Sequence, residues 1–134
     1  MSGVHAPVVA LYAGLLGLVF LYLSVRVIGN RRRAQIALGV AGDAGLERAA
    51  RVQGNFAEYV PLILVLVWLV EGSGYPAWAV HGLGGALVAG RAIHAYGVSQ
   101  AREDFRFRVT GMVLTFATLA GSAGLLLAGR LFGG

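Results

Sequence analysis

Residues 8–25 read VVALYAGLLGLVFLYLSV, a run of 18 positions without a charged side chain. A helix needs about 20 mostly apolar residues to cross the ~30 Å hydrocarbon core of a bilayer. Three more apolar stretches of similar length follow along the chain. We therefore predict an all-α integral membrane protein, a bundle of four transmembrane helices over about residues 6–28, 46–70, 77–98 and 107–131.

The composition supports this fold class. The chain has 134 residues, of which 57% are hydrophobic and only 13% are charged, whereas a soluble domain carries about 25% charged residues. This length predicts a single membrane domain over residues 1–134, without a separate soluble catalytic module. The absence of cysteine excludes disulfides, thiolate metal sites and a cysteine nucleophile, and we expect no metal.

The arginines predict the orientation in the membrane. Residues 26–51 contain six of the 11 basic residues and residues 91–108 contain four, all of them arginine. Basic loops stay in the cytoplasm, so both termini should lie on the non-cytoplasmic side. The net charge of +5 is therefore explained by membrane topology, and we expect no nucleic-acid partner. A cleaved signal peptide fits poorly, because no basic region precedes the first apolar run.

A ladder of polar residues opens the second predicted span. Arg48, Arg51, Asn55 and Glu58 follow at steps of three and four, which places them within about 80° of arc on one helix face, with Tyr59 at its edge. An ionisable group at the depth of Glu58 costs several kcal/mol unless it is paired. Glu58 is therefore either a structural ion-pair partner for an arginine of a neighbouring helix or part of a binding site.

Two other segments bring cations to the same membrane boundary. Arg91 and His94 lie one helical turn apart near the end of the third span. His94 suits proton transfer, although a hydrogen-bonded interfacial histidine is the commoner case. Arg106 and Arg108 alternate with aromatic residues at the start of the fourth span, a pattern that simple membrane anchors also produce.

Together these groups suit a small anion with more than one carboxylate and one ammonium group. Arginines bind carboxylates through paired hydrogen bonds. Glu58 would pair with the ammonium group, and Asn55 or Gln53 would bind peptide amides. Glutathione carries this set of groups.

At these residues the sequence resembles the membrane-associated proteins of eicosanoid and glutathione metabolism (MAPEG), which include microsomal glutathione transferases and leukotriene-forming synthases. The resemblance covers the whole chain as four spans. Its motifs are Arg51-x-x-x-Asn55-x-x-Glu58-Tyr59-x-Pro61, Gly90-Arg-x-x-His-x-Tyr-Gly97 and Arg106-x-Arg108-x-x-Gly111. The second and third motifs are most similar to the small bacterial branch, which implies a bacterial inner membrane.

The resemblance implies a left-handed four-helix bundle that forms a homotrimer, with glutathione as co-substrate in clefts between subunits. In the eukaryotic enzymes an arginine near the start of the fourth helix activates the thiol. Arg106 and Arg108 both lie there, and Arg108 is the favoured candidate. The implied glutathione contacts are Arg51, Gln53, Asn55, Glu58, Tyr59, Arg91, Arg33, His94 and Tyr96.

This sequence departs from the family pattern at two places. Bacterial relatives often carry histidine where this chain has Gln53. The eukaryotic enzymes have tyrosines in the third helix, where this chain offers His94 and Tyr96. The glutathione contacts are therefore better supported than the catalytic residue.

The implied activity is conjugation or reduction of lipophilic electrophiles with glutathione, as in a detoxifying transferase or peroxidase. A non-catalytic lipid-binding or scaffold protein of the same fold is the main alternative. A small multidrug exporter also has four spans, but its membrane carboxylate lies in the first span, whereas Glu58 lies in the second.

Overall fold

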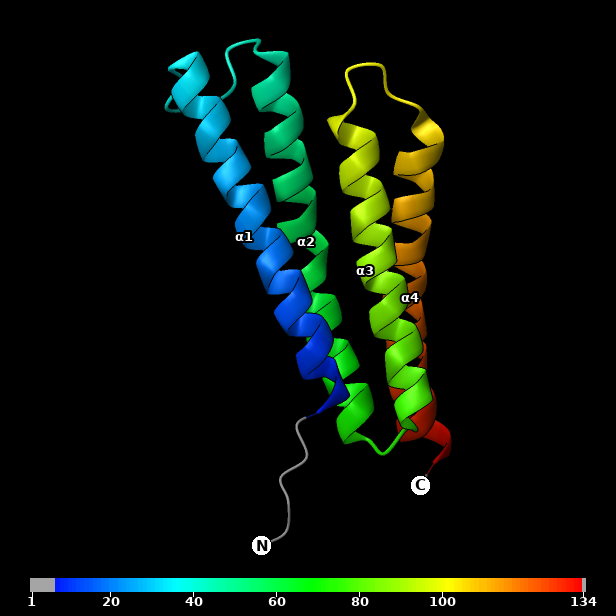
Figure 1. Ribbon diagram of the computed structural model, residues 1–134. Helices are drawn as coiled ribbons and strands as arrows, with labels where there is room; N and C mark the ends of the chain where they lie inside the picture. Colours follow the sequence, from blue (N-terminus) through cyan, green and yellow to red (C-terminus); the bar gives the residue numbers. More distant parts are fainter. Residues whose placement is uncertain (1–6, 134) are drawn as a thin grey trace, which may run out of the picture.

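The computed structural model describes residues 7–133, which form four helices that run antiparallel to their chain neighbours (Figure 1). They are α1 (Val8–Ala34), α2 (Ala44–Gly72), α3 (Ala77–Ser99) and α4 (Phe105–Phe132). Each described helix end lies within two residues of its prediction, except that α1 continues from 28 to 34. Arginine favours helix even outside the apolar core, so the basic residues 31–33 extend α1. The predicted start of the first span, Ala6, lies outside the described residues.

Three of the four helices are long and apolar enough to cross a membrane, namely α1, α2 and α4. The remaining helix, α3, has 23 residues and is therefore about 35 Å long at 1.5 Å per residue. It contains many glycine and alanine residues together with Arg91 and two histidines, and it is not among the three candidate spans. The predicted all-helical fold is confirmed, with three candidate spans and one shorter helix of mixed composition.

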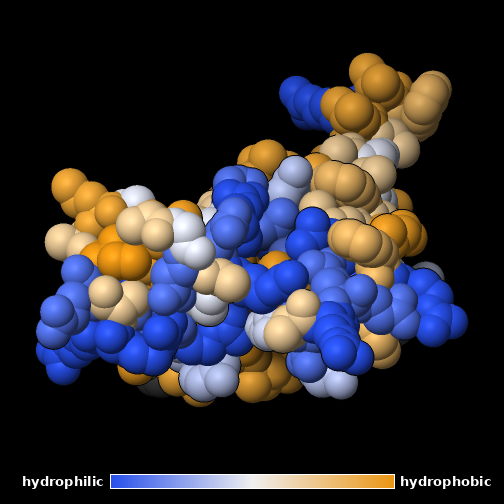
Figure 2. Space-filling model, turned by 90° about the horizontal axis from the view of Figure 1, so that it is seen from above, coloured by the Kyte–Doolittle hydropathy of each residue, from blue (hydrophilic) through white to orange (hydrophobic). Residues whose placement is uncertain are grey.

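The side chains are distributed as expected for a protein that lipid surrounds. Large apolar residues such as Leu18, Trp68 and Trp78 point outward and are mostly exposed. Polar residues, among them Thr115 and Ser122, are buried where the helices meet. Figure 2 views the end that carries the α1–α2 and α3–α4 loops, and hydrophilic residues gather over it.

The closest helix contact fixes α3 against α4. A Cβ atom on Gly90 would lie 2.9 Å from the Cβ of Leu114, and one on Gly111 would lie 2.7 Å from the carbonyl oxygen of Gly90. Only glycine allows two helix backbones to approach this closely. Arg91 and His94 follow Gly90 within about one helical turn, so the contact places both of them directly against α4.

Candidate ligand-binding site

Arg91 lies at the centre of the polar residues that the sequence singled out. Its side chain is buried at 2% exposure. Nη2 donates a hydrogen bond to Asn55 Oδ1 on α2 at 2.6 Å, and Nη1 donates to Thr115 Oγ1 on α4 at 3.3 Å. His94 Nδ1 lies 3.4 Å from Nη2. Arg91 therefore connects three helices.

The charge of Arg91 has no anionic partner close by. No carboxylate of the described residues lies within 4.0 Å of its guanidinium nitrogens. Burial of an unpaired charge is costly, and neutral hydrogen-bond partners compensate only part of that cost. The buried cation therefore favours an anion beside it.

A pocket of about 140 Å³ opens next to Arg91 between α2, α3 and α4. Four sequence-predicted residues meet there. Its lining consists of Arg51, Asn55, His94, Val98, Arg108 and Met112. The pocket is thus rich in hydrogen-bond donors and carries two arginines, which suits an anionic ligand.

Glu58 corrects one expectation. Its Oε1 lies 3.6 Å from Nη1 of Arg51, and the two side chains are 53% and 58% exposed. Of the two readings of Glu58, the ion pair with an arginine of a neighbouring helix is not formed among residues 7–133, because the partner lies two turns earlier on α2 itself. Tyr59, beside Glu58, packs edge-on against Phe116 of α4 with ring centroids 5.4 Å apart. The exposed Arg51–Glu58 pair faces outward from a single chain, where lipid would leave both charges poorly solvated.

Arg106 and Arg108 occupy different surroundings. Arg106 is 91% exposed and pairs with Asp104 at 2.8 Å. The Arg106 guanidinium and the backbone N–H of Arg106 hold the pKa of the Asp104 carboxyl below its usual value. Arg108, two residues later, lines the pocket. Of the two candidate thiol-activating residues, the geometry places only Arg108 beside the candidate ligand groups.

Two further predicted contacts lie away from the pocket for reasons of helical periodicity. Gln53 donates to Ser24 Oγ on α1 at 3.0 Å. Tyr96 is largely exposed and packs against Phe107 at a ring-centroid distance of 5.2 Å. Each residue is two positions from a pocket residue, which corresponds to about 200° around the helix. Tyr96 instead lines a separate hollow of about 350 Å³ between α1 and α3, together with Arg91 and Arg26. Within one chain, neither Gln53 nor Tyr96 lines the pocket of Arg51 and Arg108.

The arginine predicted to come from the first helix is also occupied elsewhere. Arg33 pairs with Asp43 in the α1–α2 connection at 2.7 Å. The pKa of the Asp43 carboxyl is lowered, first by its hydrogen bond from Arg33 and then by that from the backbone N–H of Leu46. Asp43 is also the N-cap of α2, so this pair orders the start of that helix.

Three residues around the pocket were missed by the sequence analysis. Met112 and Thr115 lie one and two turns after Arg108 on α4, so the helical period could have found them. Glu103 lies in the α3–α4 connection. Its carboxylate is only 6% exposed and contacts Arg48 at 3.0 Å and Arg108 at 2.6 Å. No periodic pattern predicts a contact from a loop.

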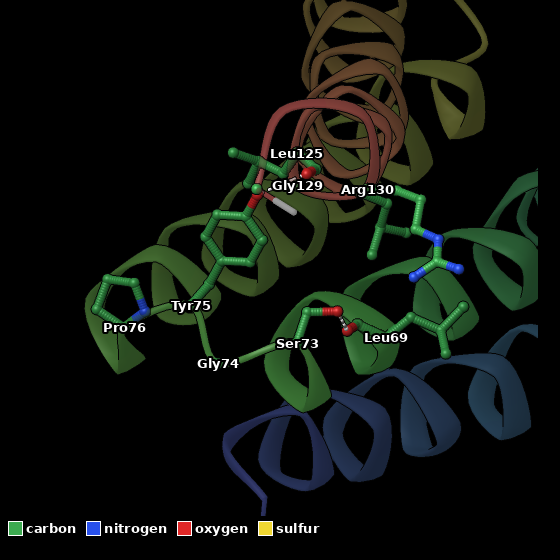
Figure 3. A pocket seen from close by; sticks show the side chains of 10 residues that line it. Leu69, Ser73, Gly74, Tyr75, Pro76, Leu125, Gly129 and Arg130 are labelled. Carbon is green, nitrogen blue, oxygen red and sulfur yellow. Dashed lines mark hydrogen bonds between the residues drawn. The ribbon is translucent and has the colours of Figure 1, made fainter.

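A larger hollow of about 640 Å³ lies at the opposite end of the bundle, between the α2–α3 turn and the end of α4 (Figure 3). Its walls include Leu69, Leu125 and the ring of Tyr75, whose hydroxyl donates to the carbonyl oxygen of Leu125. Among the described residues that line it, Arg130 alone is charged. This hollow lacks the convergent polar groups that orient a polar ligand.

The four-helix bundle and the polar pocket at its basic end place the protein in the class of small helical membrane proteins. Residues 9–128 match the MAPEG family, and this chain belongs to that family. It is 38% identical over 110 residues to "Inner membrane protein YecN" of Escherichia coli (strain K12), with 82% of each chain covered. The protein of the same name from Escherichia coli O6:H1 (strain CFT073) matches equally well.

Proposed function

We propose that this protein is a membrane-bound glutathione transferase or peroxidase, which conjugates or reduces lipophilic electrophiles with glutathione held between the subunits of a homotrimer. The observation that carries this proposal is the buried cation of Arg91, which has no carboxylate partner among residues 7–133, behind a pocket where Arg51, Asn55 and Arg108 converge. The family is named for eicosanoid and glutathione metabolism, and its membership supports the same ligand.

The pocket chemistry matches the groups of glutathione. Arg51 and Arg108 bind carboxylates or the thiolate, and Asn55, held by Arg91 at 2.6 Å, binds a peptide amide. Glu58 exchanges its weak contact with Arg51, 3.6 Å long, for the ligand ammonium group. Each of these side chains therefore has a defined partner on the ligand.

The size of the pocket supports a site between subunits. Its volume of about 140 Å³ is below the roughly 300–1,000 Å³ of pockets that enclose drug-sized ligands. One chain therefore covers only part of a tripeptide. A neighbouring subunit seated against the exposed Arg51–Glu58 face would cover the remainder and remove these charges from lipid. Arg33 or a neighbouring arginine of a second subunit would then reach the ligand.

Arg108 supplies the chemistry in this proposal. A cysteine thiol has an ordinary pKa near 8.5 and is mostly protonated at neutral pH. A guanidinium beside the sulfur favours the thiolate and releases the thiol proton to water, and each unit of lowered pKa corresponds to about 1.36 kcal/mol. The thiolate then forms a carbon–sulfur bond with the electrophile, and water protonates the displaced or newly formed anion.

A hydroperoxide would be reduced by the same nucleophile. The thiolate attacks the terminal oxygen and the O–O bond breaks, which gives the sulfenic acid of glutathione and an alkoxide that water protonates to the alcohol. A second glutathione then gives the disulfide and water. Both reactions need a lipophilic acceptor, which an apolar groove of about 250 Å³ between α1 and α2, lined by Phe20, Phe56 and Leu64, would hold.

The relatives and the arginine distribution support a location and an orientation. Both Escherichia coli relatives carry the name of inner membrane proteins, and we place this chain in a bacterial inner membrane. The end with the α1–α2 and α3–α4 loops would face the cytoplasm. Both termini would lie on the other side, and the pocket would then open toward cytoplasmic glutathione.

Calorimetry on the detergent-purified protein tests this proposal. Glutathione should bind in the micromolar-to-millimolar range, and Arg51→Ala should abolish the binding. Arg106→Ala, which removes an exposed arginine at the same end, is the matched control and should bind as the wild type does. If the wild type binds no glutathione, the proposal fails, and a lipid-binding or scaffold role with structural Arg51–Glu58 and Arg108–Glu103 pairs replaces it.

A further inference from the structure

Glu103 is the most deeply buried carboxylate of the ion pairs in the described part of the chain. It comes from the short α3–α4 connection and meets arginines of two helices. Arg48 on α2 donates from Nη1 to Oε1 at 3.0 Å, and Arg108 on α4 donates from Nη2 to the same oxygen at 2.7 Å. Nε of Arg108 lies 2.6 Å from Oε2, a close ionic contact without hydrogen-bond angles.

Arg48 is itself anchored to the bundle. Its Nη1 also donates to the backbone carbonyl oxygen of Val98 at 2.9 Å, near the end of α3. Glu103 therefore ties Arg108 to a side chain whose position is set by α2 and α3. The stack of Arg108 over the ring of Phe105, 5.6 Å from the ring centroid, restrains the same guanidinium from a second side.

The contact leaves part of Arg108 available to a ligand. Glu103 occupies the Nε and Nη2 edge, whereas Nη1 has no hydrogen-bond partner within residues 7–133. Arg108 lines the pocket together with Arg51 and Asn55. Two arginines share one carboxylate, so the cluster keeps a net charge of +1 and still attracts an anion.

We propose that Glu103 is the positioning residue for Arg108, which it holds at the pocket so that Nη1 meets the ligand sulfur. An arginine side chain otherwise samples many rotamers, and a displacement of about 1 Å in a reacting group can lower the rate as much as 10²-fold. This inference rests on the proposed role of Arg108 in thiolate formation. It adds that the α3–α4 connection sets the geometry of that step.

The variant Glu103→Gln tests the inference through the separation of kcat from KM. We expect kcat for conjugation to fall about tenfold and the thiol pKa of bound glutathione to rise toward its free value. The KM for glutathione should change less than about threefold, because Glu103 contacts neither Arg51 nor Asn55. Glu103→Asp should restore part of the rate. Glu47→Gln, an exposed acid at the same end, is the matched control and should behave as the wild type.

A double-mutant cycle separates positioning from general damage to the fold. In the Arg108→Ala background, Glu103→Gln should cause less than about a twofold further loss of kcat, because the group it positions is gone. An independent loss in that background, or an unchanged kcat in Glu103→Gln alone, overturns the positioning role.

The two proposals can fail separately. A wild type that forms no thiolate contradicts the proposed function. In that case the unfolding temperatures of the same variants are measured. Non-additive changes in these temperatures report the contact between Glu103 and Arg108 and need no enzymatic activity. Absence of that coupling contradicts the positioning contact itself, and its presence restricts Glu103 to a structural role.

Discussion

Two hollows at opposite ends of the bundle differ in size and in chemistry. The smaller one is lined by several polar side chains, and the larger one is mainly apolar. The pocket beside Arg91 at the basic end has about 140 Å³ and is lined by two arginines, an asparagine, a histidine and two apolar residues. The other end has about 640 Å³ lined mainly by apolar side chains and Arg130. The smaller hollow is the better candidate, since convergent polar groups orient a ligand and volume alone does not.

Two carboxylates of α2 differ in a similar way: Glu71 lies near the end of the helix and Glu58 lies at its middle. Glu71, at the end with the larger hollow, accepts hydrogen bonds from the backbone N–H groups of Val8 and Val9 at 2.5 and 2.9 Å. Both its oxygens are thus used to cap the N-terminus of α1, where a negative charge is favourable. Glu58 forms an ion pair with Arg51 at 3.6 Å, its sole one within residues 7–133, and is half exposed. The first acid is satisfied within the fold, whereas the second is available to a ligand.

The largest expected effect is on turnover at the basic end. Arg108→Ala should lower kcat about 10²–10³-fold, the usual cost of losing one donor to a developing or full anion. Glutathione should still bind, because Arg51, Asn55 and Arg91 remain. Steady-state kinetics with a lipophilic electrophile measure this, and Arg106→Ala serves as the exposed control. Equal losses in both variants would contradict the assignment of Arg108.

The next effect is on affinity. Arg91→Ala removes the hydrogen bonds that hold Asn55 and Thr115, and hydrogen bonds from charged groups contribute about 1.5–3 kcal/mol. Glutathione binding should weaken on the order of 10- to 100-fold, as calorimetry would show. Arg91→Lys keeps the charge but cannot bind Asn55 and Thr115 together, so its glutathione affinity should lie between those of the wild type and Arg91→Ala. Wild-type affinity in Arg91→Ala would remove the central cation from the site.

A smaller effect is expected at the rim of the pocket. Glu58→Gln should weaken glutathione about tenfold, because the ligand ammonium group loses its anionic partner. A glutathione analogue without the ammonium group is the control, and it should bind the wild type and the variant equally. If Glu58→Gln also weakens the binding of the analogue, Glu58 does not act through the ammonium group of the ligand. Loss of drug–proton antiport in this variant would instead indicate an exporter.

The pH dependence at the start of α4 should be smaller still. Arg106 lowers the pKa of the Asp104 carboxyl in the folded protein. The stabilisation by this pair is therefore complete above the ordinary pKa of about 4 and is lost as the pH falls through the lowered value. The unfolding temperature of Asp104→Asn should lie slightly below that of the wild type at neutral pH, and the two should converge in strong acid. A difference that grows in acid would reverse this sign.

The smallest effect is expected at the apolar end. Arg130 lies in the larger hollow, far along α4 from Arg108. Arg130→Ala should change the glutathione affinity and kcat by less than about twofold, since screened charges at such separations interact weakly. A loss comparable with that in Arg108→Ala would reverse the comparison of the two ends.

The helices and part of the site could be predicted because both depend on local periodicity. Apolar runs located all four helices, and spacings of three and four brought Arg51 and Asn55 to one face of α2. Gln53 was expected to bind a peptide amide and Tyr96 was implied by resemblance, but the helical period turns both away from the pocket of their own chain.

The remaining contacts depend on loops and on distant partners. Asp43 holds Arg33 across the α1–α2 connection, and Glu103 holds Arg108 from the α3–α4 connection. The periodicity of a helix predicts contacts within that helix, but it does not predict contacts between a loop residue and a helix.

The most direct measurement of the central claim is the ultraviolet absorbance of the glutathione thiolate, recorded against pH with the purified protein. The wild type and Arg130→Ala should both show bound thiolate near neutral pH, and Arg108→Ala should bind glutathione without forming it. Bound glutathione that stays protonated in the wild type, or thiolate that persists in Arg108→Ala, would contradict thiol activation in the basic pocket.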